Sequence, residues 1–285
     1  MAMTFFNPVY LDKAVRAALD EDLGRAGDVT TLATIPAGRM ATAVMALRKP
    51  GVVCGLPVVE AVFRTIDPSL KFEALAEDSA DMPGNRTPVA RISGDARAIL
   101  TAERVALNYM CRLSGIATMT AKYVALVAHT NAKICCTRKT TPGLRALEKY
   151  AVRCGGAMNH RFGLDDAILI KDNHIAVCGG VKQALRAAKA AAGHLVKIEI
   201  EVDTLDQLRE VIAEGADFCL LDNMTVDTMR EAVKISAGRV KFEASGGINI
   251  ETVKTIAETG VDLISSGSLT HSAPILDVGL DIEIG

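Results

Sequence analysis

Aromatic residues are scarce in this sequence of 285 residues, which has no tryptophan, four tyrosines and seven phenylalanines. Proteins that bind single-stranded nucleic acid need aromatic side chains on which bases stack, and few are available here. The net charge is -2, whereas a general nucleic-acid binder is strongly basic. We therefore expect no nucleic-acid partner.

Long apolar runs are missing as well. No stretch approaches the ~20 residues that a membrane span needs, and residues 1–8 lack the apolar region and cleavage site of a secretory signal. The seven cysteines are odd in number and show no Cys-x-x-Cys or Cys-His ligand spacing. We interpret them as small core residues in a reducing compartment, since a catalytic thiol has no motif to support it. The expectation is a cytoplasmic protein without a membrane partner.

About half of the residues are apolar, which predicts a globular chain with one large domain or two of ordinary size. In the first third, helices are predicted over 11–23 and 57–66, and strands over 43–47, 52–54, 70–75 and 89–92. Residues 21–31 are interpreted as a polar loop. A helical pattern over 98–129 is expected to break into two helices at Ser114-Gly115. Clustered strands with few crossover helices favour an antiparallel sheet.

From residue 132 onward the pattern alternates between short apolar strands and amphipathic helices. The predicted strands are 134–137, 167–171, 196–202, 218–222, 240–244 and 263–265, and the predicted helices are 181–192, 205–214, 226–236 and 250–258. This alternation is typical of a parallel sheet. A full eight-unit barrel takes ~250 residues, so we expect an incomplete barrel or an open doubly wound sheet. In either case ligands bind at the carboxyl ends of the strands.

Those strand ends are charged or rich in glycine and serine. In order they carry Arg138 and Lys139, Lys171, Glu201, Asp222, then Ser245, Gly246 and Gly247, then Ser265, Ser266 and Gly267. Residues 133–161 also hold seven Lys or Arg against one acid. A solvated basic loop would explain that segment alone, but not charges gathered at one end of the strands. We predict an anion-binding site there.

The residue types suggest a phosphorylated ligand with a cation. The planar guanidinium of Arg138 suits a carboxylate or phosphate, and Lys139 and Lys171 suit phosphate oxygens. Glu201 and Asp222 would be unfavourable beside phosphates unless a divalent cation or sugar hydroxyls intervened, so we expect Mg²⁺ and ribose contacts.

Neighbouring residues extend this interpretation. The turn 245–247 leads into a helix and can expose amides to phosphate. His160 and Arg161 add positive charge before the second barrel strand, and Glu199 shares the strand face of Glu201 at greater depth. No Walker A loop occurs. Lys171 could form a Schiff base, but the following Asp172 and the phosphate-type surroundings disfavour a neutral amine.

Several motifs resemble one family. They are Glu103-Arg104-Val105-Ala106-Leu107-Asn108, Ser114-Gly115-Ile116-Ala117-Thr118, Thr137-Arg138-Lys139-Thr140-Thr141-Pro142-Gly143, Gly156 through His160-Arg161, Ile170-Lys171-Asp172-Asn173-His174, Leu221-Asp222-Asn223 and Ala244-Ser245-Gly246-Gly247-Ile248. Together they are similar to the quinolinate phosphoribosyltransferase family, and the likeness extends over essentially the whole chain.

The resemblance implies an α/β fold: an N-terminal α/β sandwich (1–113), an incomplete, about seven-stranded α/β barrel with the active site (114–271), and a C-terminal tail (272–285) that returns to the first domain. It further implies a homodimer in which the first domain of one subunit covers the barrel mouth of the other. A hexamer is left open.

Residue roles follow from the same resemblance. Arg104, acting across the interface, and Arg138, His160 and Arg161 would bind the carboxylates of quinolinate, beside Thr137. Lys139, Lys171, Glu201, Asp222 and the turns at 245–247 and 265–267 would hold phosphoribosyl pyrophosphate and its Mg²⁺, which Glu201 and Asp222 would bind directly or through the substrate. Lys139, Lys171, Glu201 and Asp222 are the expected catalytic residues. His271 lies in a variable part of the pattern, and its role is left open.

The implied enzyme is a pentosyltransferase, the carboxylating nicotinate-nucleotide pyrophosphorylase of NAD synthesis. It would make nicotinate mononucleotide, pyrophosphate and CO₂. A paralogue that acts on another small acid is the alternative, and loss of Arg104 or Arg161 would favour it. A binding protein without catalysis is a third possibility, against which Lys139, Glu201 and Asp222 argue.

Overall fold

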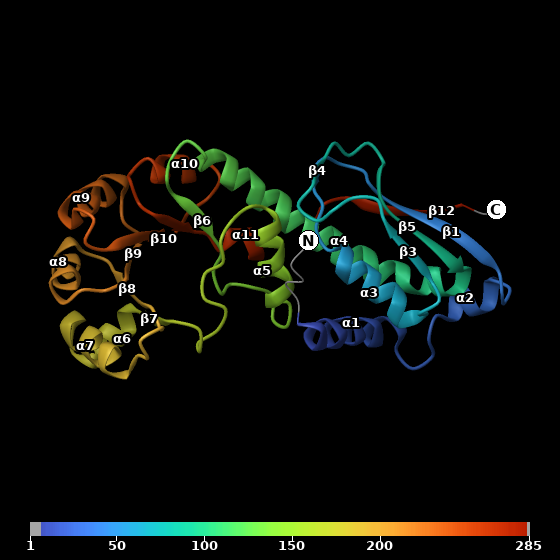
Figure 1. Ribbon diagram of the computed structural model, residues 1–285, viewed down its shortest axis with the longest axis horizontal. Coiled ribbons are helices and arrows are strands. Elements are labelled where there is room, and N and C mark those ends of the chain that lie inside the picture. Colours follow the sequence, from blue (N-terminus) through green and yellow to red (C-terminus); the bar gives the residue numbers. More distant parts are fainter. Residues whose placement is uncertain (1–6, 284–285) are drawn as a thin grey trace. The chain divides into compact units, whose positions relative to one another are not determined.

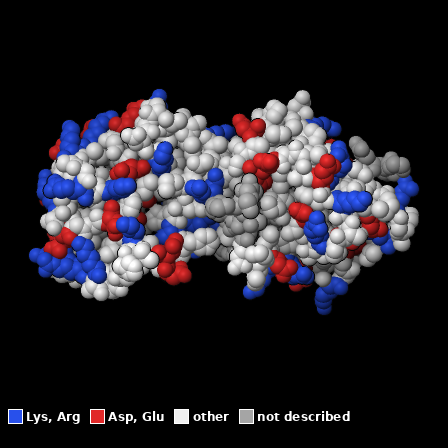
Figure 2. Space-filling view, viewed as in Figure 1, with Lys and Arg blue, Asp and Glu red and all other residues white. Residues whose placement is uncertain are grey.

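The computed structural model describes residues 7–283, which divide into two compact units. The first contains the chain up to Ala121, the segment Thr141–Gly156 and the residues from Ala273 onward; the second contains Lys122–Thr140 and Ala157–Ser272. The predicted bounds 1–113, 114–271 and 272–285 stay a prediction. Figure 1 shows the elements of each unit, and Figure 2 shows acidic and basic side chains interspersed over the face that it draws.

The first unit is built on a four-stranded antiparallel sheet. Its strand order is β12 (Val278–Glu283), β1 (Met40–Leu47), β5 (Thr87–Asp95) and β3 (Lys71–Ala74). A second ladder joins β2 (Gly51–Val52) to β4 (Asp81–Met82). Along β1 the buried positions include Ala43, Met45 and Leu47, so alternate residues form the core face. The prediction of an antiparallel sheet in this part of the chain is confirmed.

Among residues 7–283, five helices belong wholly or mainly to the first unit. They are α1 (Pro8–Leu23), α2 (Val29–Thr34), α3 (Leu56–Ile66), α4 (Ala96–Val127) and α5 (Arg145–Cys154). The helix α1 ends at Gly24, as the sequence predicts. The prediction of a loop over 21–31 is wrong at both ends, because α1 extends to Leu23 and α2 begins at Val29. The Asp28 side chain accepts a hydrogen bond from Thr31 N and so caps α2.

The predicted break at Ser114-Gly115 is also wrong, since α4 runs unbroken for 32 residues. Gly115 is needed for close packing: a Cβ there would lie 2.1 Å from the carbonyl oxygen of Pro274. The Ser114 hydroxyl donates to Cys54 O and accepts from Cys54 N. Both residues therefore serve tertiary contacts within the first unit, although their types suggest a helix break.

The second unit is organised around a six-stranded parallel sheet. Its order is β6 (Lys133–Cys135), β11 (Leu263–Ser265), β10 (Lys241–Ser245), β9 (Phe218–Asp222), β8 (Ile198–Val202) and β7 (Ile168–Ile170). Strands β7 to β11 follow one another, and β6 lies beside β11, so the order does not reverse as it does in a doubly wound sheet. One isolated parallel bridge, Cys135–Met158, extends the β6 edge. The architecture is an incomplete α/β barrel, with this bridge at the position of a seventh strand.

The helices of the second unit follow the strands. They are α6 (Asp172–Cys178), α7 (Val181–Ala191), α8 (Leu205–Glu214), α9 (Val226–Ser236), α10 (Val253–Ala257) and α11 (Ser268–His271). Helices α8 and α9 have the predicted bounds, whereas α6 and α11 were not predicted. The helix α10 is shorter than predicted and begins at Val253, so the prediction that the turn 245–247 leads directly into it is wrong. Because each strand runs in the same direction, all six carboxyl ends lie at one edge of the sheet.

Candidate active site

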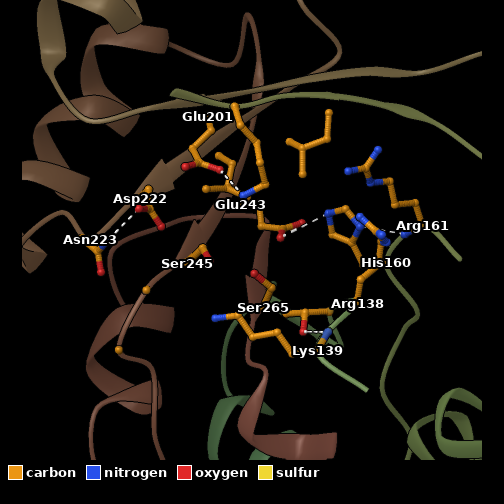
Figure 3. Close-up of a pocket in the computed structure, with 16 residues that line it drawn as sticks. Arg138, Lys139, His160, Arg161, Glu201, Asp222, Asn223, Glu243, Ser245 and Ser265 are labelled. Carbon is orange, nitrogen blue, oxygen red and sulfur yellow. Dashed lines mark hydrogen bonds and ion pairs between the residues drawn. The ribbon is translucent and has the colours of Figure 1, made fainter. Parts of the chain in front are cut away.

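A pocket of about 540 Å³ lies in the second unit, at the carboxyl ends of the strands. Figure 3 shows its side chains converging from neighbouring strands and from the loops before and after them. Of the predicted residues it gathers Thr137, Arg138, Lys139, His160, Arg161, Lys171, Glu201, Asp222, Ser245, Gly246, Gly247 and Ser265. Leu169, Leu220, Asn223 and Glu243 also line it.

Three predicted residues are not part of that lining. Arg104 lies on α4 in the first unit and is exposed. Ser266 is buried, and its hydroxyl donates to Ile248 O. Gly267 lies close to the side chain of Lys139, since a Cβ at that glycine would be 2.8 Å from Cδ of the lysine. Gly267 thus leaves room for a pocket cation.

Lys171 and Glu201 form an ion pair in the pocket. Lys171 follows β7 and caps α6, and its Nζ donates to Oε2 of Glu201 at 3.0 Å. The Glu201 side chain is 10% exposed and that of Lys171 49%, so the carboxylate is the more enclosed partner. Asp222 ends the next strand, β9, and accepts a hydrogen bond from the Asn223 side chain.

Glu201 and Asp222 suit a magnesium ion by their chemistry. Both offer carboxylate oxygens, the donors that Mg²⁺ prefers. Glu201 already has Lys171 as a cationic partner, which leaves Asp222 as the less compensated carboxylate. Two carboxylates are too few to enclose the ion with protein ligands alone. The site therefore suits an ion that takes its remaining ligands from substrate oxygens.

The backbone around Arg138 and Lys139 is fixed by hydroxyl groups. Thr137 Oγ1 accepts from Lys139 N at 3.0 Å, and Thr270 Oγ1 donates to Lys139 O at 2.7 Å. The segment therefore holds two adjacent cations in a defined direction instead of forming a loose basic loop. Figure 3 shows Lys139 reaching from the wall opposite Glu201.

Arg138 and Arg161 supply a site for an anion. Nε of each is buried and has no hydrogen-bond partner among residues 7–283. Desolvation and the nearby charge of Arg138 lower the pKa of Arg161, while Arg161 donates from Nη1 to Ala167 O. Two partly desolvated guanidinium groups that repel each other are stabilised by a bound anion.

His160 is engaged with protein groups through both ring nitrogens. Nδ1 accepts from Arg161 N at 2.7 Å, and Nε2 lies 3.0 Å from Oε2 of Glu199. This pattern places the proton on Nε2, which donates to Glu199. Glu199 lies deeper than the strand ends and thus holds the pocket residue His160 through this hydrogen bond. A contact of His160 with a substrate carboxylate stays a prediction.

The glycine turn after β10 has a steric requirement. Gly246 and Gly247 have φ of 91° and 62°, a region that favours glycine. A Cβ at Gly246 would lie 2.2 Å from Oδ1 of Asn223, whose backbone N donates to Ser245 O. The turn therefore lies directly against the end of β9, as a close phosphate-binding turn requires.

Sequence reasoning missed Glu243, although the sequence holds a signal for it. Glu243 and Ser245 are two residues apart in β10, like Glu199 and Glu201 in β8. Residues at this spacing point to the same face of a strand. Two inward-facing acids, Glu199 and Glu243, therefore lie one layer below the strand ends. Glu243 is 2% exposed.

Comparison with known proteins assigns the chain to a family. Residues 28–114 match the model for "Quinolinate phosphoribosyl transferase, N-terminal domain", and residues 116–281 match that for the C-terminal domain. The chain belongs to the quinolinate phosphoribosyltransferase family. The predicted family is confirmed.

Individual relatives agree with this family assignment. The chain is 44% identical to a probable carboxylating nicotinate-nucleotide pyrophosphorylase of Bacillus subtilis, covering 98% of this chain and 95% of the relative. It is 48% identical to the carboxylating nicotinate-nucleotide pyrophosphorylase of Mycobacterium leprae, covering 94% and 95%. The solved nicotinate-nucleotide pyrophosphorylase of Francisella tularensis is 38% identical, with a TM-score of 0.93 and 98% of each chain covered. Within residues 7–283, no helix has the length and apolarity to cross a membrane.

Proposed function

We propose that the pocket of this family member transfers phosphoribose to quinolinate. The reaction is that of a carboxylating nicotinate-nucleotide pyrophosphorylase: phosphoribosyl pyrophosphate and quinolinate give nicotinate mononucleotide, pyrophosphate and CO₂. The observation that carries the assignment is the division of one pocket into two anion sites. Unpartnered arginine nitrogens face one side, and the Lys171–Glu201 pair with Asp222 lies on the other.

Quinolinate is placed on the arginine side. Arg138 and Arg161 each have a buried, unpartnered Nε that a carboxylate oxygen can satisfy. Two arginines are more than a monocarboxylate such as nicotinate needs, and an excess of buried positive charge disfavours a ligand with only one anionic group. The pocket therefore selects a diacid, whose two carboxylates together balance both guanidinium groups.

Phosphoribosyl pyrophosphate is placed on the other side. Lys139 and Lys171 neutralise phosphate oxygens, and the backbone amides of the turn from Ser245 to Gly247 bind the 5′-phosphate or the pyrophosphate. Glu201 and Asp222 would hold Mg²⁺ and the ribose hydroxyls. When bound, the ion supplies charge neutralisation for the leaving pyrophosphate.

The chemistry requires positioning more than a protein nucleophile. The pyridine nitrogen attacks the anomeric carbon as pyrophosphate leaves, so the pocket must align two anions that repel each other. Arg138 and Lys139 are adjacent and hold one reactant each. The cationic wall stabilises the negative charge that develops on pyrophosphate. The new pyridinium nitrogen then stabilises the carbanion formed when the 2-carboxylate leaves as CO₂.

A second copy of the chain completes the site in this proposal. Arg104, exposed on the first unit, would contact the diacid bound to the partner subunit, which gives a homodimer with shared active sites. Assembly of dimers into a hexamer and a cytoplasmic location stay predictions.

A substrate comparison tests the proposed function. Purified protein with Mg²⁺ and phosphoribosyl pyrophosphate should form nicotinate mononucleotide from quinolinate and no nucleotide from nicotinate, because only the diacid balances both arginines. Arg161→Met should lower kcat/KM for quinolinate by about 100-fold, on the order of one buried charge-assisted contact. Arg230→Met is the matched control, since Arg230 pairs with Asp227 on the exposed face of α9. Turnover of another acid, with none of quinolinate, would refute the proposal.

A further inference from the structure

Glu243 lies between two pockets of the second unit. The active-site pocket is one, and the other is a pocket of about 350 Å³ near the amino ends of the strands, lined by Ile168, Phe218 and Leu263 among others. The acids of the active-site pocket are Glu201, Asp222 and Glu243, and those of the amino-end pocket are Asp166, Glu199 and Glu243. Among the acids described here, Glu243 alone is shared, so its carboxyl group can meet substrate on one side and water on the other.

The carboxyl group of Glu243 lacks a strong partner. Its side chain is 3% exposed, and Oε1 has no hydrogen bond within the described chain. The nearest basic atom, Nε2 of His160, lies 3.7 Å from Oε1, which is too long for a hydrogen bond. Oε2 accepts a weak contact from the Cys135 thiol at 3.8 Å, and the Ser265 hydroxyl adds a further hydrogen bond to the carboxyl group. An ionised carboxylate would be poorly stabilised in this position.

The groups around Glu243 favour its neutral form. Burial and then the negative charge of Glu199 raise the pKa of Glu243 to about 7, against a smaller opposing effect of His160. The Nε2–H group of His160 donates its hydrogen bond to Glu199 and not to Glu243. The thiols on the flanking strands, Cys135 and Cys219, are buried, and burial raises the pKa of each, so they carry no charge near neutral pH.

Cations line the two pockets near Glu243: Arg138 lines the active-site pocket, Arg161 lines both pockets, and Lys197 lines the amino-end pocket, where it pairs with Asp217. Nε of each arginine lacks an acceptor within the described chain. The bound diacid would neutralise the two arginines, which leaves Glu243 beside Glu199 without a cation of its own. Substrate binding therefore favours the protonated form of Glu243 further.

We propose that Glu243 is the general acid that protonates the pyridine carbon from which CO₂ departs. The inference rests on the proposed phosphoribosyl transfer and decarboxylation. The bond from the ring carbon to the 2-carboxylate breaks, and its electron pair stays on that carbon beside the pyridinium nitrogen. The O–H bond of Glu243 breaks in the same step, as its proton passes to the carbon, so the release of CO₂ depends on this proton transfer. The decarboxylation consumes one proton in total, and this proton reaches the Glu243 carboxylate from bulk solvent through water in the amino-end pocket.

A single-turnover experiment separates this step from phosphoribosyl transfer. The full chain with Mg²⁺, phosphoribosyl pyrophosphate and quinolinate labelled in the 2-carboxylate is followed for pyrophosphate and for labelled CO₂. In the wild-type protein both products should appear at one rate below about pH 7, where Glu243 is protonated. In Glu243→Gln, pyrophosphate should still form in the first turnover, whereas CO₂ and nicotinate mononucleotide should form at least 10-fold more slowly.

The pH profile of CO₂ formation gives an independent test, because a purely structural role of Glu243 would not alter that profile. Because the protonated form is required, the rate of CO₂ formation in the wild type should fall as pH rises through about 7. Glu243→Asp keeps an acid and should retain this fall at a lower rate, and Glu243→Gln should lose it. Glu258→Gln is the matched control, since Glu258 contacts His129 at 3.0 Å on the surface and should behave as wild type.

Each outcome decides the proposal. Equal slowing of pyrophosphate and CO₂ in Glu243→Gln, or an unchanged pH profile, would overturn it. If Glu243→Gln does not fold, loss of the alkaline fall in Glu243→Asp would do the same. Failure of the wild-type protein to form either product would instead refute the proposed reaction.

The supply of protons from the amino-end pocket has its own test. Phe218→Trp should narrow that pocket, which Phe218 lines at the start of β9. The first turnover should then keep its rate while steady-state turnover falls, because only later turnovers need a new proton on Glu243. An equal effect on both phases would contradict this route.

Discussion

Nζ of Lys171 donates a hydrogen bond to Oε2 of Glu201 at 3.0 Å and so joins the ends of β7 and β8 across the active-site pocket. The two residues are far apart in the sequence, so the pair depends on the fold. The parallel sheet brings them together, because β7 and β8 are neighbours and end at the same edge. The pair places a cation and a carboxylate where the phosphoribosyl donor is expected.

Lys171→Met should lower kcat/KM by about 100-fold, because the lost cation leaves Glu201 as an uncompensated negative charge beside the pyrophosphate. Lys171→Met combined with Glu201→Gln should be less impaired than the product of the two single effects, since the residues act as a pair. Steady-state kinetics with varied phosphoribosyl pyrophosphate measure this. Lys182→Met, which removes an exposed partner of Glu214, is the control and should have wild-type kinetics. Independent effects of the two substitutions would argue against a functional pair.

Arg104→Ala and Lys139→Ala should each abolish activity, and mixing the two inactive proteins should restore part of it. In a random mixture half of the dimers are hybrids with one intact site of two, so roughly one quarter of wild-type activity is expected. The assay is nicotinate mononucleotide formation after subunit exchange. Lys139→Ala mixed with Asp222→Asn should remain inactive, because both substitutions affect the same pocket. Absence of rescue in the first mixture would argue against a site shared between subunits.

Glu148→Ala should destabilise the first unit. The Glu148 side chain is fully buried, and it accepts hydrogen bonds from Arg112 at 2.7 Å and from Thr141 Oγ1 at 2.8 Å. Removing a buried partner leaves other polar groups uncompensated, at a cost of about 3 kcal/mol in the free energy of unfolding. Urea titration measures this. Glu60→Ala, which breaks the exposed pair with Arg64, should cost less than about 1 kcal/mol. Equal effects of the two substitutions would contradict the structural role of Glu148.

Stability should depend on pH through Glu243. Its pKa is raised to about 7 in the folded protein, so the folded state holds this proton more tightly than the unfolded state does. The stabilisation is fully present below the unfolded pKa, near 4, and is lost as pH rises through about 7. Glu243→Gln removes this dependence, so its melting temperature relative to wild type should increase from pH 5 to pH 8. A difference that stays constant over that range would contradict a neutral Glu243.

The second unit could largely be predicted from the sequence because its signals are local. Short apolar strands alternate with amphipathic helices, and the strand ends that carry Lys171, Glu201 and Asp222 must meet at one edge of a parallel sheet. Helices α8 and α9 have clear N-terminal caps, Thr204 and Thr225, and their bounds were predicted correctly.

Other features depend on contacts between distant residues and could not be predicted in this way. Gly115 indicates a helix break by its type, yet it faces the backbone of Pro274, about 160 positions further along the chain. The helix α5 directly follows the pocket segment but belongs to the first unit, where Tyr150 donates to Asp78. The environment of Glu243 likewise depends on Glu199 from β8 and on the His160 loop.

The ratio of CO₂ to pyrophosphate in the wild-type reaction tests the central claim most directly. Quinolinate labelled in the 2-carboxylate is incubated with the purified protein, phosphoribosyl pyrophosphate and Mg²⁺, and both products are counted over many turnovers. The account predicts one labelled CO₂ for each pyrophosphate, and no CO₂ when phosphoribosyl pyrophosphate is omitted. Pyrophosphate release without CO₂, or no release of either product, would contradict it.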